Sequence, residues 1–262
     1  MLIVFVLYQH GISEPSKFKM LDLPDRLSFV GAVSNLERMG AVENGCVSTL
    51  GRKMLDYSIP PFAAYCLSRK FNGDPRDRQD LITLIAILCS DNFLIGGATS
   101  DLADIRKRYQ VIGSDHLSKL TLFYKFVEAK SKKEFCRHAG IRRKIAEQVL
   151  LLREQLSLVD LKASNKDLPK SQPLTLESAI NGVIPHFSFN REKLLTHWKE
   201  SFFTRTAVLV GTSEYKIENC GSRAWVHPDS VIFLEKSKPR KVIFNTIVRT
   251  KKLYMRDISS ID

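Results

Sequence analysis

The spacing of apolar and polar residues changes along the chain, and the first 72 residues combine two patterns. Residues 2–8 form a short apolar run, and apolar residues recur at every third position from 27 to 39; both segments are predicted to be helical. Asn44-Gly45 then lies between two short strand-like pieces, which is the strongest short signal for a hairpin. A further short helix is predicted at 50–55. Helices followed by a hairpin are typical of a winged helix, so we predict a winged-helix domain over 1–72.

The pattern between 73 and 160 is mainly helical, with a loop at 73–75 and a glycine-containing break at 93–100. Residues 81–89 are almost wholly apolar, and helical spacing of apolar residues recurs in 105–112, 117–129 and 142–156. We predict an all-helical bundle over 73–160. Residues 161–173 are mostly polar and contain two prolines, which predicts a linker.

The last stretch, 174–262, begins with a short predicted helix and continues in strand-like runs. The runs are separated by turn residues and lie at 202–210, 214–218, 224–233, 242–248 and 253–258. Several short strands of this kind are typical of a small barrel. The three patterns together predict an α+β multidomain protein.

Charge adds a candidate partner. The chain carries 40 Lys and Arg against 28 Asp and Glu, and its formal net charge is +12. This surplus favours a polyanionic partner, either nucleic acid or an anionic membrane surface, although solvated helix faces are also often basic. Residues 101–153 hold 13 Lys and Arg against 6 Asp and Glu. A second basic cluster comprises Lys236, Lys238, Arg240, Lys241, Arg249, Lys251 and Lys252.

Signals for chemistry within the chain are weak. No Gly-x-x-x-x-Gly-Lys-Ser/Thr sequence is present, and Gly96-Gly97 opens a turn that lacks the phosphate-binding lysine. Cys136 and His138 are close in sequence, but one amphipathic segment holding both is poor evidence for a nucleophile and its base. We predict no catalytic residue, no metal ligand and no cofactor site here. Five cysteines, an odd number without a Cys-x-x-Cys pair, favour a reducing intracellular compartment. The apolar run 2–8 is too short for a membrane helix, so we expect no membrane partner.

Several short motifs occur in a fixed order along the chain. The most specific are Val-His-Pro-Asp-Ser-Val at 226–231 and Thr-Lys-Lys-Leu-Tyr-Met-Arg at 250–256. Leu-Asp-Leu-Pro at 21–24, Thr-Leu-Gly-Arg-Lys-Met at 49–54, Ser-Asp-His-Leu at 114–117 and Ile-Arg-Arg at 141–143 precede them. In this order the motifs resemble the C-terminal half of DEAH-box (DEAH/RHA) ATP-dependent RNA helicases. The resemblance covers nearly the whole chain.

The resemblance implies a fold and a function for each stretch. It implies a winged helix over 1–72, a helical ratchet bundle (the helicase-associated domain) over 73–160 and an OB-fold barrel over 174–262. In that family these domains close a channel over single-stranded RNA, while two RecA-like domains bind ATP and Mg²⁺. The motifs of those domains are absent here, so we expect the ATPase core, in cis or in trans, to be a partner rather than part of this sequence.

The resemblance also implies site residues and partners. RNA contacts are expected from the ratchet helix at Arg142, Arg143 and Lys144, and from the barrel. The barrel residues expected to bind are His227, Ser230, Thr250, Lys251 and Lys252. An activator of the G-patch type is a further expected partner, and a nuclear location, with a role in mRNA splicing, is favoured over a cytoplasmic one.

Three questions stay open from the sequence. His227 could contact a phosphate or only cap the Pro228 turn, and Asp229 stands where the family tends to have serine. The aromatic residues Trp225, Phe233 and Phe244 fit a core pattern better than a base-stacking surface, whereas Tyr254 fits either. A stand-alone protein that binds duplex nucleic acid through its winged helix, and a protein-interaction scaffold, are the alternative functions.

Overall fold

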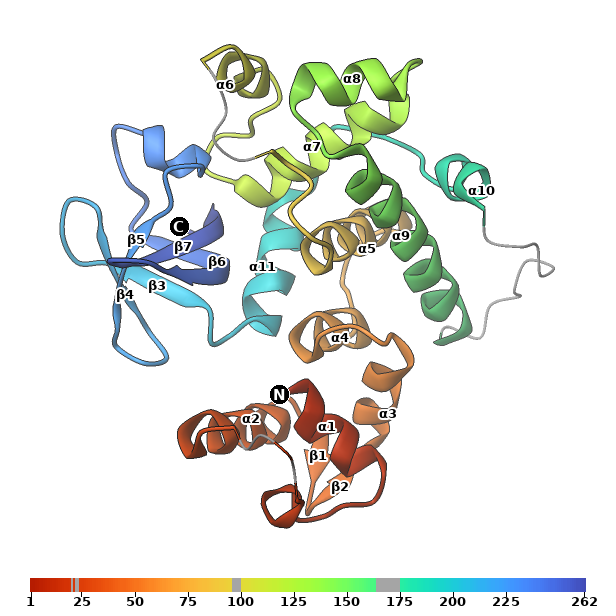
Figure 1. Cartoon of the computed structure of the whole chain (residues 1–262), viewed down its shortest axis with the longest axis vertical. Helices are drawn as coiled ribbons and strands as arrows, with labels where there is room; N and C mark the ends of the chain where they lie inside the picture. Colours follow the sequence, from red (N-terminus) through yellow and green to blue (C-terminus); the bar gives the residue numbers. More distant parts are fainter. Residues whose placement is uncertain (20, 22–23, 96–99, 164–174) are drawn as a thin grey trace. The chain divides into compact units, whose positions relative to one another are not determined.

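The computed structural model describes residues 1–19, 21, 24–95, 100–163 and 175–262 (Figure 1). These residues form two compact units. The first comprises residues 1–70 and the end of the long helix α9 (Arg143–Ala163), and the second comprises the other described residues. In the described part of the chain no helix combines the length and the apolar composition that a membrane crossing needs.

The first unit is a group of short helices with one hairpin. Its elements are α1 (Leu2–Gln9), η1 (Pro15–Lys17), α2 (Arg26–Arg38), β1 (Val42–Glu43), β2 (Cys46–Val47), α3 (Thr49–Asp56) and α4 (Pro61–Ser68). Asn44 and Gly45 join β1 to β2 with φ angles of 50° and 73°. Positive φ at both positions suits a two-residue hairpin turn. The predicted hairpin is therefore confirmed, whereas the winged-helix arrangement stays a prediction.

Helix α2 buries only part of the predicted apolar stripe. Asp25 caps the helix by accepting the backbone N–H of Ser28 at 2.9 Å. Leu36 and Met39 are buried, but Leu27 and Val30 are 84% and 56% exposed. Only the C-terminal half of the stripe therefore contributes to the core of this unit.

The helices of the second unit include the predicted bundle. They are α5 (Pro75–Cys89), α6 (Ser100–Lys107), α7 (Asp115–Glu128), α8 (Lys132–Ala139), the main part of α9, α10 (Leu176–Asn181) and α11 (Arg191–Ser201). Helix α5 begins at a capping box between Asp74 and Asp77 and buries most of the apolar run that was predicted to be helical. Helix α9 continues to Ala163, so the first three residues of the predicted linker are helical; 164–173 lie outside the described residues.

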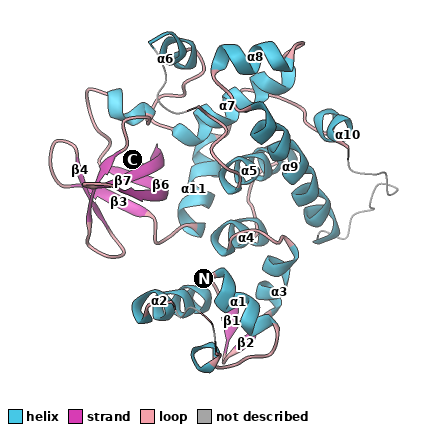
Figure 2. Cartoon of the chain, viewed as in Figure 1, coloured by secondary structure: helices cyan, strands magenta, loops and turns pink. Residues whose placement is uncertain are grey.

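The rest of the second unit is a closed barrel of five strands (Figure 2). The strands are β3 (Thr206–Leu209), β4 (Glu214–Ile217), β5 (Arg223–Val226), β6 (Lys241–Arg249) and β7 (Leu253–Ser260). Their order around the barrel is β3-β4-β5-β7-β6, and β5 pairs with β7 in parallel while every other pair is antiparallel. A closed five-stranded barrel of this kind is OB-like.

Side chains of all five strands fill the barrel core. Ala224 and Val226 of β5 and Met255 and Ile258 of β7 belong to one buried cluster, together with Tyr215 of β4. Phe244 is in this core as predicted, but the predictions for Phe233 and Trp225 are wrong: the Phe233 side chain is 45% exposed, and Trp225 does not belong to the buried cluster. The predicted strand 224–233 ends at Val226, and Val231–Leu234 instead form the short 3-10 helix η2. Because Phe233 lies in η2 and not in a strand, the alternation that suggested its burial does not apply.

Candidate nucleic-acid interface

Helix α7 is joined to the barrel through its first turn. Asp115, the first residue of α7, accepts backbone N–H groups from Val231 (2.8 Å) and Ile258 (2.9 Å) with its two carboxylate oxygens. Ser114, the N-cap of α7, lies 2.6 Å from Ser259 through the two hydroxyl oxygens. These bonds are formed inside the second unit, so they fix the barrel against the helical bundle. Burial raises the pKa of the Asp115 carboxyl to about 6, although both backbone bonds favour its charged form.

His116, the next residue, is completely buried beside Asp115. Its Nδ1 atom lies 2.6 Å from Ser259 Oγ, and its ring packs against Trp198 at 5.2 Å between centroids. Burial lowers the pKa of His116 to about 4, well below the ordinary histidine value. The imidazole is therefore neutral at physiological pH.

We expect His116 to make the protein sensitive to acid. Since an unfolded histidine has a pKa near 6.5, the unfolded state binds more protons between pH 6.5 and 4, and stability falls as the pH falls through this window. The shift corresponds to about 3 kcal/mol of unfolding free energy between pH 7 and 4. In urea denaturation at fixed ionic strength, the wild type should lose about this much more than His116→Gln. Asp115 acts in the opposite sense but is present in both proteins; identical pH profiles would contradict the expectation.

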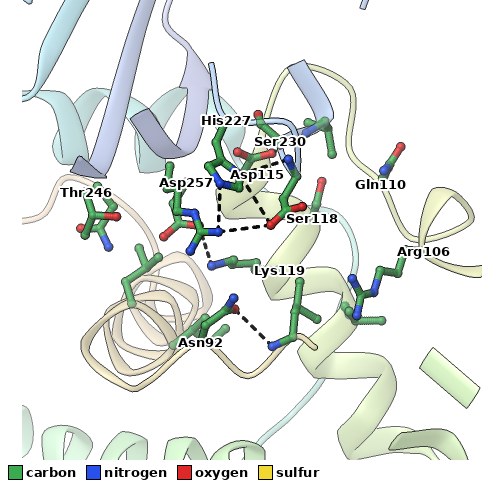
Figure 3. A pocket seen from close by; sticks show the side chains of 18 of the residues that line it. Asn92, Arg106, Gln110, Asp115, Ser118, Lys119, His227, Ser230, Thr246 and Asp257 are labelled. Carbon is green, nitrogen blue, oxygen red and sulfur yellow. Dashed lines mark hydrogen bonds and ion pairs between the residues drawn. The ribbon is translucent and has the colours of Figure 1, made fainter. Parts of the chain in front are cut away.

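A pocket of about 320 Å³ lies where the barrel meets α5 and α7 (Figure 3). Residues of α5 and α7 and the loop after α5 line one side, and His227, Thr246 and Arg256 of the barrel line the other. Lys119 of α7 and Arg106 of α6 add two further cations. The pocket therefore contains several groups that could meet a phosphate.

Most of these cations already have partners. Lys119 pairs with Asp257 at 2.6 Å, and the Arg256 guanidinium lies 3.3 Å from Asp229 Oδ2 and 3.0 Å from His227 Nε2. The Arg106 guanidinium donates to the carbonyls of Ile95, Ala139 and Gly140. Partial burial and the nearby Arg256 also lower the pKa of His227. The positive and negative groups inside the pocket thus balance one another. The aspartate at position 229 has a structural role, because it orients Arg256.

The strand pairing places a set of side chains on the outer surface of the barrel. On β5, Arg223 and Trp225 alternate with the core residues Ala224 and Val226 and therefore point outward. The strand pairing sets Trp225 opposite Glu214 on one side and Tyr254 on the other, and Tyr254 opposite Val248. Rows of outward side chains therefore cross four strands. We define the outer face as Glu214, Lys216, Arg223, Trp225, His227, Thr246, Val248, Thr250, Lys252, Tyr254 and Arg256.

The outer face is basic with an aromatic centre. It carries Lys216, Arg223, Lys252 and Arg256; Arg223 pairs with Glu214 of the same face at 2.8 Å, and Arg256 lies 3.3 Å from Asp229 beside it. Among the described residues, Lys216 and Lys252 take part in no ion pair. OB-folds bind oligonucleotides on the face of their second and third strands and on the loops between strands 1–2 and 4–5. In this barrel those are β4, β5 and the turns at 210–213 and 250–252.

The structure brings some of the predicted barrel residues together. His227, Thr250 and Lys252 share the outer face, and Lys251 is exposed beside them in the β6–β7 turn, where the Thr250 N–H donates to the Lys252 carbonyl at 3.0 Å. Ser230 lies next to His227, whose carbonyl accepts its N–H at 2.9 Å, but its side chain is buried and its hydroxyl accepts the Ile232 N–H, capping η2.

The predicted ratchet residues lie at the start of α9. Arg142, Arg143 and Lys144 are exposed, and Arg143 pairs with Glu147 at 2.7 Å. The Arg142 N–H donates to the Phe93 carbonyl at 2.7 Å, and Ile95 N–H to the Gly140 carbonyl at 2.9 Å. The segment before α9 is therefore held against the pocket-lining loop after α5.

Sequence reasoning did not select Lys216, Arg223 or Arg256 as site residues. The available signal was the alternation Arg-Ala-Trp-Val-His at 223–227, in which every second residue is polar or aromatic. Alternation alone does not say which strands are neighbours. The parallel pairing of β5 with β7, which joins Trp225 to Tyr254, links positions far apart in the chain.

Comparison with known proteins shows what the chain is similar to. Residues 199–262 match the family model for an oligonucleotide/oligosaccharide-binding (OB) fold, which is found at the C-terminal end of DEAH-box helicases. The match starts within α11 and includes the whole barrel. The predicted resemblance to the C-terminal region of DEAH-box RNA helicases is thereby confirmed.

The particular relatives extend the similarity over nearly the whole chain. The probable ATP-dependent RNA helicase DHX35 of Homo sapiens is 24% identical over 258 residues, which cover 96% of this chain and 34% of the relative. The ATP-dependent RNA helicase DHX33 of Mus musculus is 24% identical over 253 residues, or 94% of this chain and 33% of the relative. The chain thus spans about a third of the length of the curated relatives that it matches.

Proposed function

We propose that this chain is an RNA-binding C-terminal module of a DEAH-box RNA helicase and that the outer face is its main contact with single-stranded RNA. The observation that carries the proposal is the placement of Lys216, Lys252 and Arg256 around Trp225 and Tyr254 on the strands that OB-folds use for oligonucleotides. Binding through lysine and arginine to phosphates carries little sequence preference. The similarity to named RNA helicases supports RNA as the polyanion.

We propose a second contact at the start of α9. Arg142 and Lys144 are exposed there, and the segment that precedes them borders the loop that lines the pocket. An RNA strand leaving the outer face past His227 would meet these cations next. In this arrangement the Ser230 side chain does not contact RNA; its cap on η2 supports the His227 turn.

The remaining parts of the proposal concern partners. We propose that a RecA-like core, in cis or in trans, supplies ATP binding, Mg²⁺ and movement, and that this chain closes the RNA channel over it. The first unit would act as the winged helix and receive a G-patch-type activator. A nuclear location fits such a module. The similarity to longer ATP-dependent RNA helicases supports the first of these statements, the ATP-binding core.

Replacing Lys251 and Lys252 by alanine is expected to weaken single-stranded RNA binding about equally for different sequences. Each lost phosphate contact should reduce the slope of log K against log salt by about 0.7, so the pair should reduce it by about 1.4. Fluorescence anisotropy with labelled U12 and A12 RNA at several KCl concentrations measures both effects. Lys17→Ala/Lys19→Ala removes the same charge outside the barrel and should leave the slope unchanged. An unchanged affinity at low salt would exclude this turn from the interface.

A further inference from the structure

The outer face contains two aromatic rings that the core does not use. Trp225 and Tyr254 are directly opposite in the parallel pairing of β5 and β7, and both are half-buried. Their strand neighbours Ala224, Val226 and Met255 point inward and fill the barrel. The two rings therefore lie side by side on the outside of the barrel, where an apolar planar surface has no packing role to explain it.

Polar groups surround this aromatic pair. Lys252 Nζ lies 4.5 Å from the centroid of the Trp225 ring, and the His227 ring meets Tyr254 edge-on at 5.9 Å between centroids. Arg223 precedes Trp225 on β5, and Arg256 follows Tyr254 on β7 by the same two-residue step. Cations thus lie on both sides of the rings along the strand direction. A polymer with regularly alternating flat and anionic groups fits this arrangement better than an apolar protein surface does.

We propose that Trp225 and Tyr254 form a stacking platform for adjacent unpaired bases of single-stranded RNA, with Lys252 and Arg256 meeting the flanking phosphates. This inference rests on the proposed function and adds base stacking to its phosphate contacts. The Lys252 ammonium now covers the Trp225 ring, and a phosphate would draw it away so that a base takes its place. The exchange is favourable because an exposed cation–π contact is weaker than the stacking of a base on an aromatic ring.

Stacking predicts a preference that phosphate binding alone does not. Every base has a π-face, so the platform should accept different sequences but should require that bases be present and unpaired. An abasic strand keeps its phosphates and loses the stacking partner. A protein with the platform should therefore bind intact single strands more tightly than abasic ones, whereas a purely electrostatic surface should bind both with equal affinity.

The chain offers an internal reporter for the test. Its two tryptophans are Trp198, which is 1% exposed, and Trp225 on the outer face. We expect U12 RNA to quench the tryptophan fluorescence of the full 262-residue chain and an abasic 12-mer of equal charge to bind without quenching. Trp225→Phe should remove the quenching, because only Trp198 then emits. Quenching that persists in Trp225→Phe would overturn the assignment.

Affinities complete the experiment. Trp225→Leu and Tyr254→Leu should each weaken U12 binding about tenfold and leave binding of the abasic strand unchanged; Trp225→Phe and Tyr254→Phe should restore most of the loss. Melting curves of each variant show that the barrel is folded. Equal losses for both strands would mean that the rings are only structural and would overturn the platform, while the proposed RNA function would stand. If the wild type bound neither strand, the proposed function itself would fail, and the platform with it.

Discussion

Replacing Asp115 by alanine is expected to lower the free energy of unfolding by about 2–5 kcal/mol, because it leaves one buried and one partly buried backbone N–H group without an acceptor. The two groups belong to Val231 and Ile258, so both the start of η2 and the end of β7 lose their bond to α7. Each unsatisfied buried donor costs about 1–3 kcal/mol. Because Asp115 is one of the links between the bundle and the barrel and bonds the start of η2, we also expect the His227 turn to lose order.

Urea denaturation measures the loss, and hydrogen exchange locates it. Exchange should rise at Val231 and Ile258 before it rises in the core of α5. Asp104→Ala is the matched control, since Asp104 is exposed and pairs with Lys107 on the surface of α6, and it should change stability by less than about 0.5 kcal/mol. A stability within that same small margin in Asp115→Ala would show that the carboxylate does not hold the barrel in place.

The second large effect is expected in the first unit, at Gly51. A Cβ atom built on Gly51 would lie 2.1 Å from the Ala41 carbonyl oxygen and 2.8 Å from Val47 Cγ1. Backbone atoms cannot give way as a flexible side chain can, so Gly51→Ala should destabilise this unit by about 3 kcal/mol. The close approach of α3 to the chain at Ala41 explains why the Leu-Gly-Arg motif has a glycine at this position.

Gly31 provides the control for Gly51. It lies in α2 with no atom within 4 Å of an added Cβ, so Gly31→Ala should stabilise the helix by about 0.5–1 kcal/mol. Hydrogen exchange on both variants would report the stability of the first unit separately from that of the second. We expect Gly51→Ala to increase exchange in α3 and in the β1–β2 hairpin. Protection equal to the wild type in α3 would contradict the predicted clash.

Much of the barrel could be predicted from local pattern, and the exceptions have physical causes. The five strand-like runs each contain a strand, because alternation and turn residues are local signals. Helix α11 was missed although Leu194, Leu195 and Trp198 have helical spacing, since its many charged residues reduce the apolar contrast. Helix α8 was missed for a similar reason: it is short and buries little more than Cys136 and Ala139.

The candidate site was harder to predict than the fold. Lys252 and His227 could be selected from the motif resemblance, but their position on one face depends on the parallel pairing of β5 with β7, which no local pattern encodes. The burial of Ser230 could not be predicted from the sequence either. Its hydroxyl bonds within η2, a 3-10 helix that interrupts a run predicted to be a strand. Motifs therefore selected candidate segments, and tertiary pairing decides which of their side chains reach the surface.

The most direct test of the proposed RNA interface is a salt titration of U12 RNA binding to the full chain. About three phosphate contacts from the outer face alone should make log K fall linearly with log [KCl] with a slope of about −2, and the proposed contacts at the start of α9 should make it steeper; U12 should bind more tightly than a duplex of equal charge. The Lys251/Lys252 variant should lie on a shallower line. Binding that is absent at low salt, or that does not change with salt, would contradict the assignment of the outer face as a single-strand RNA interface.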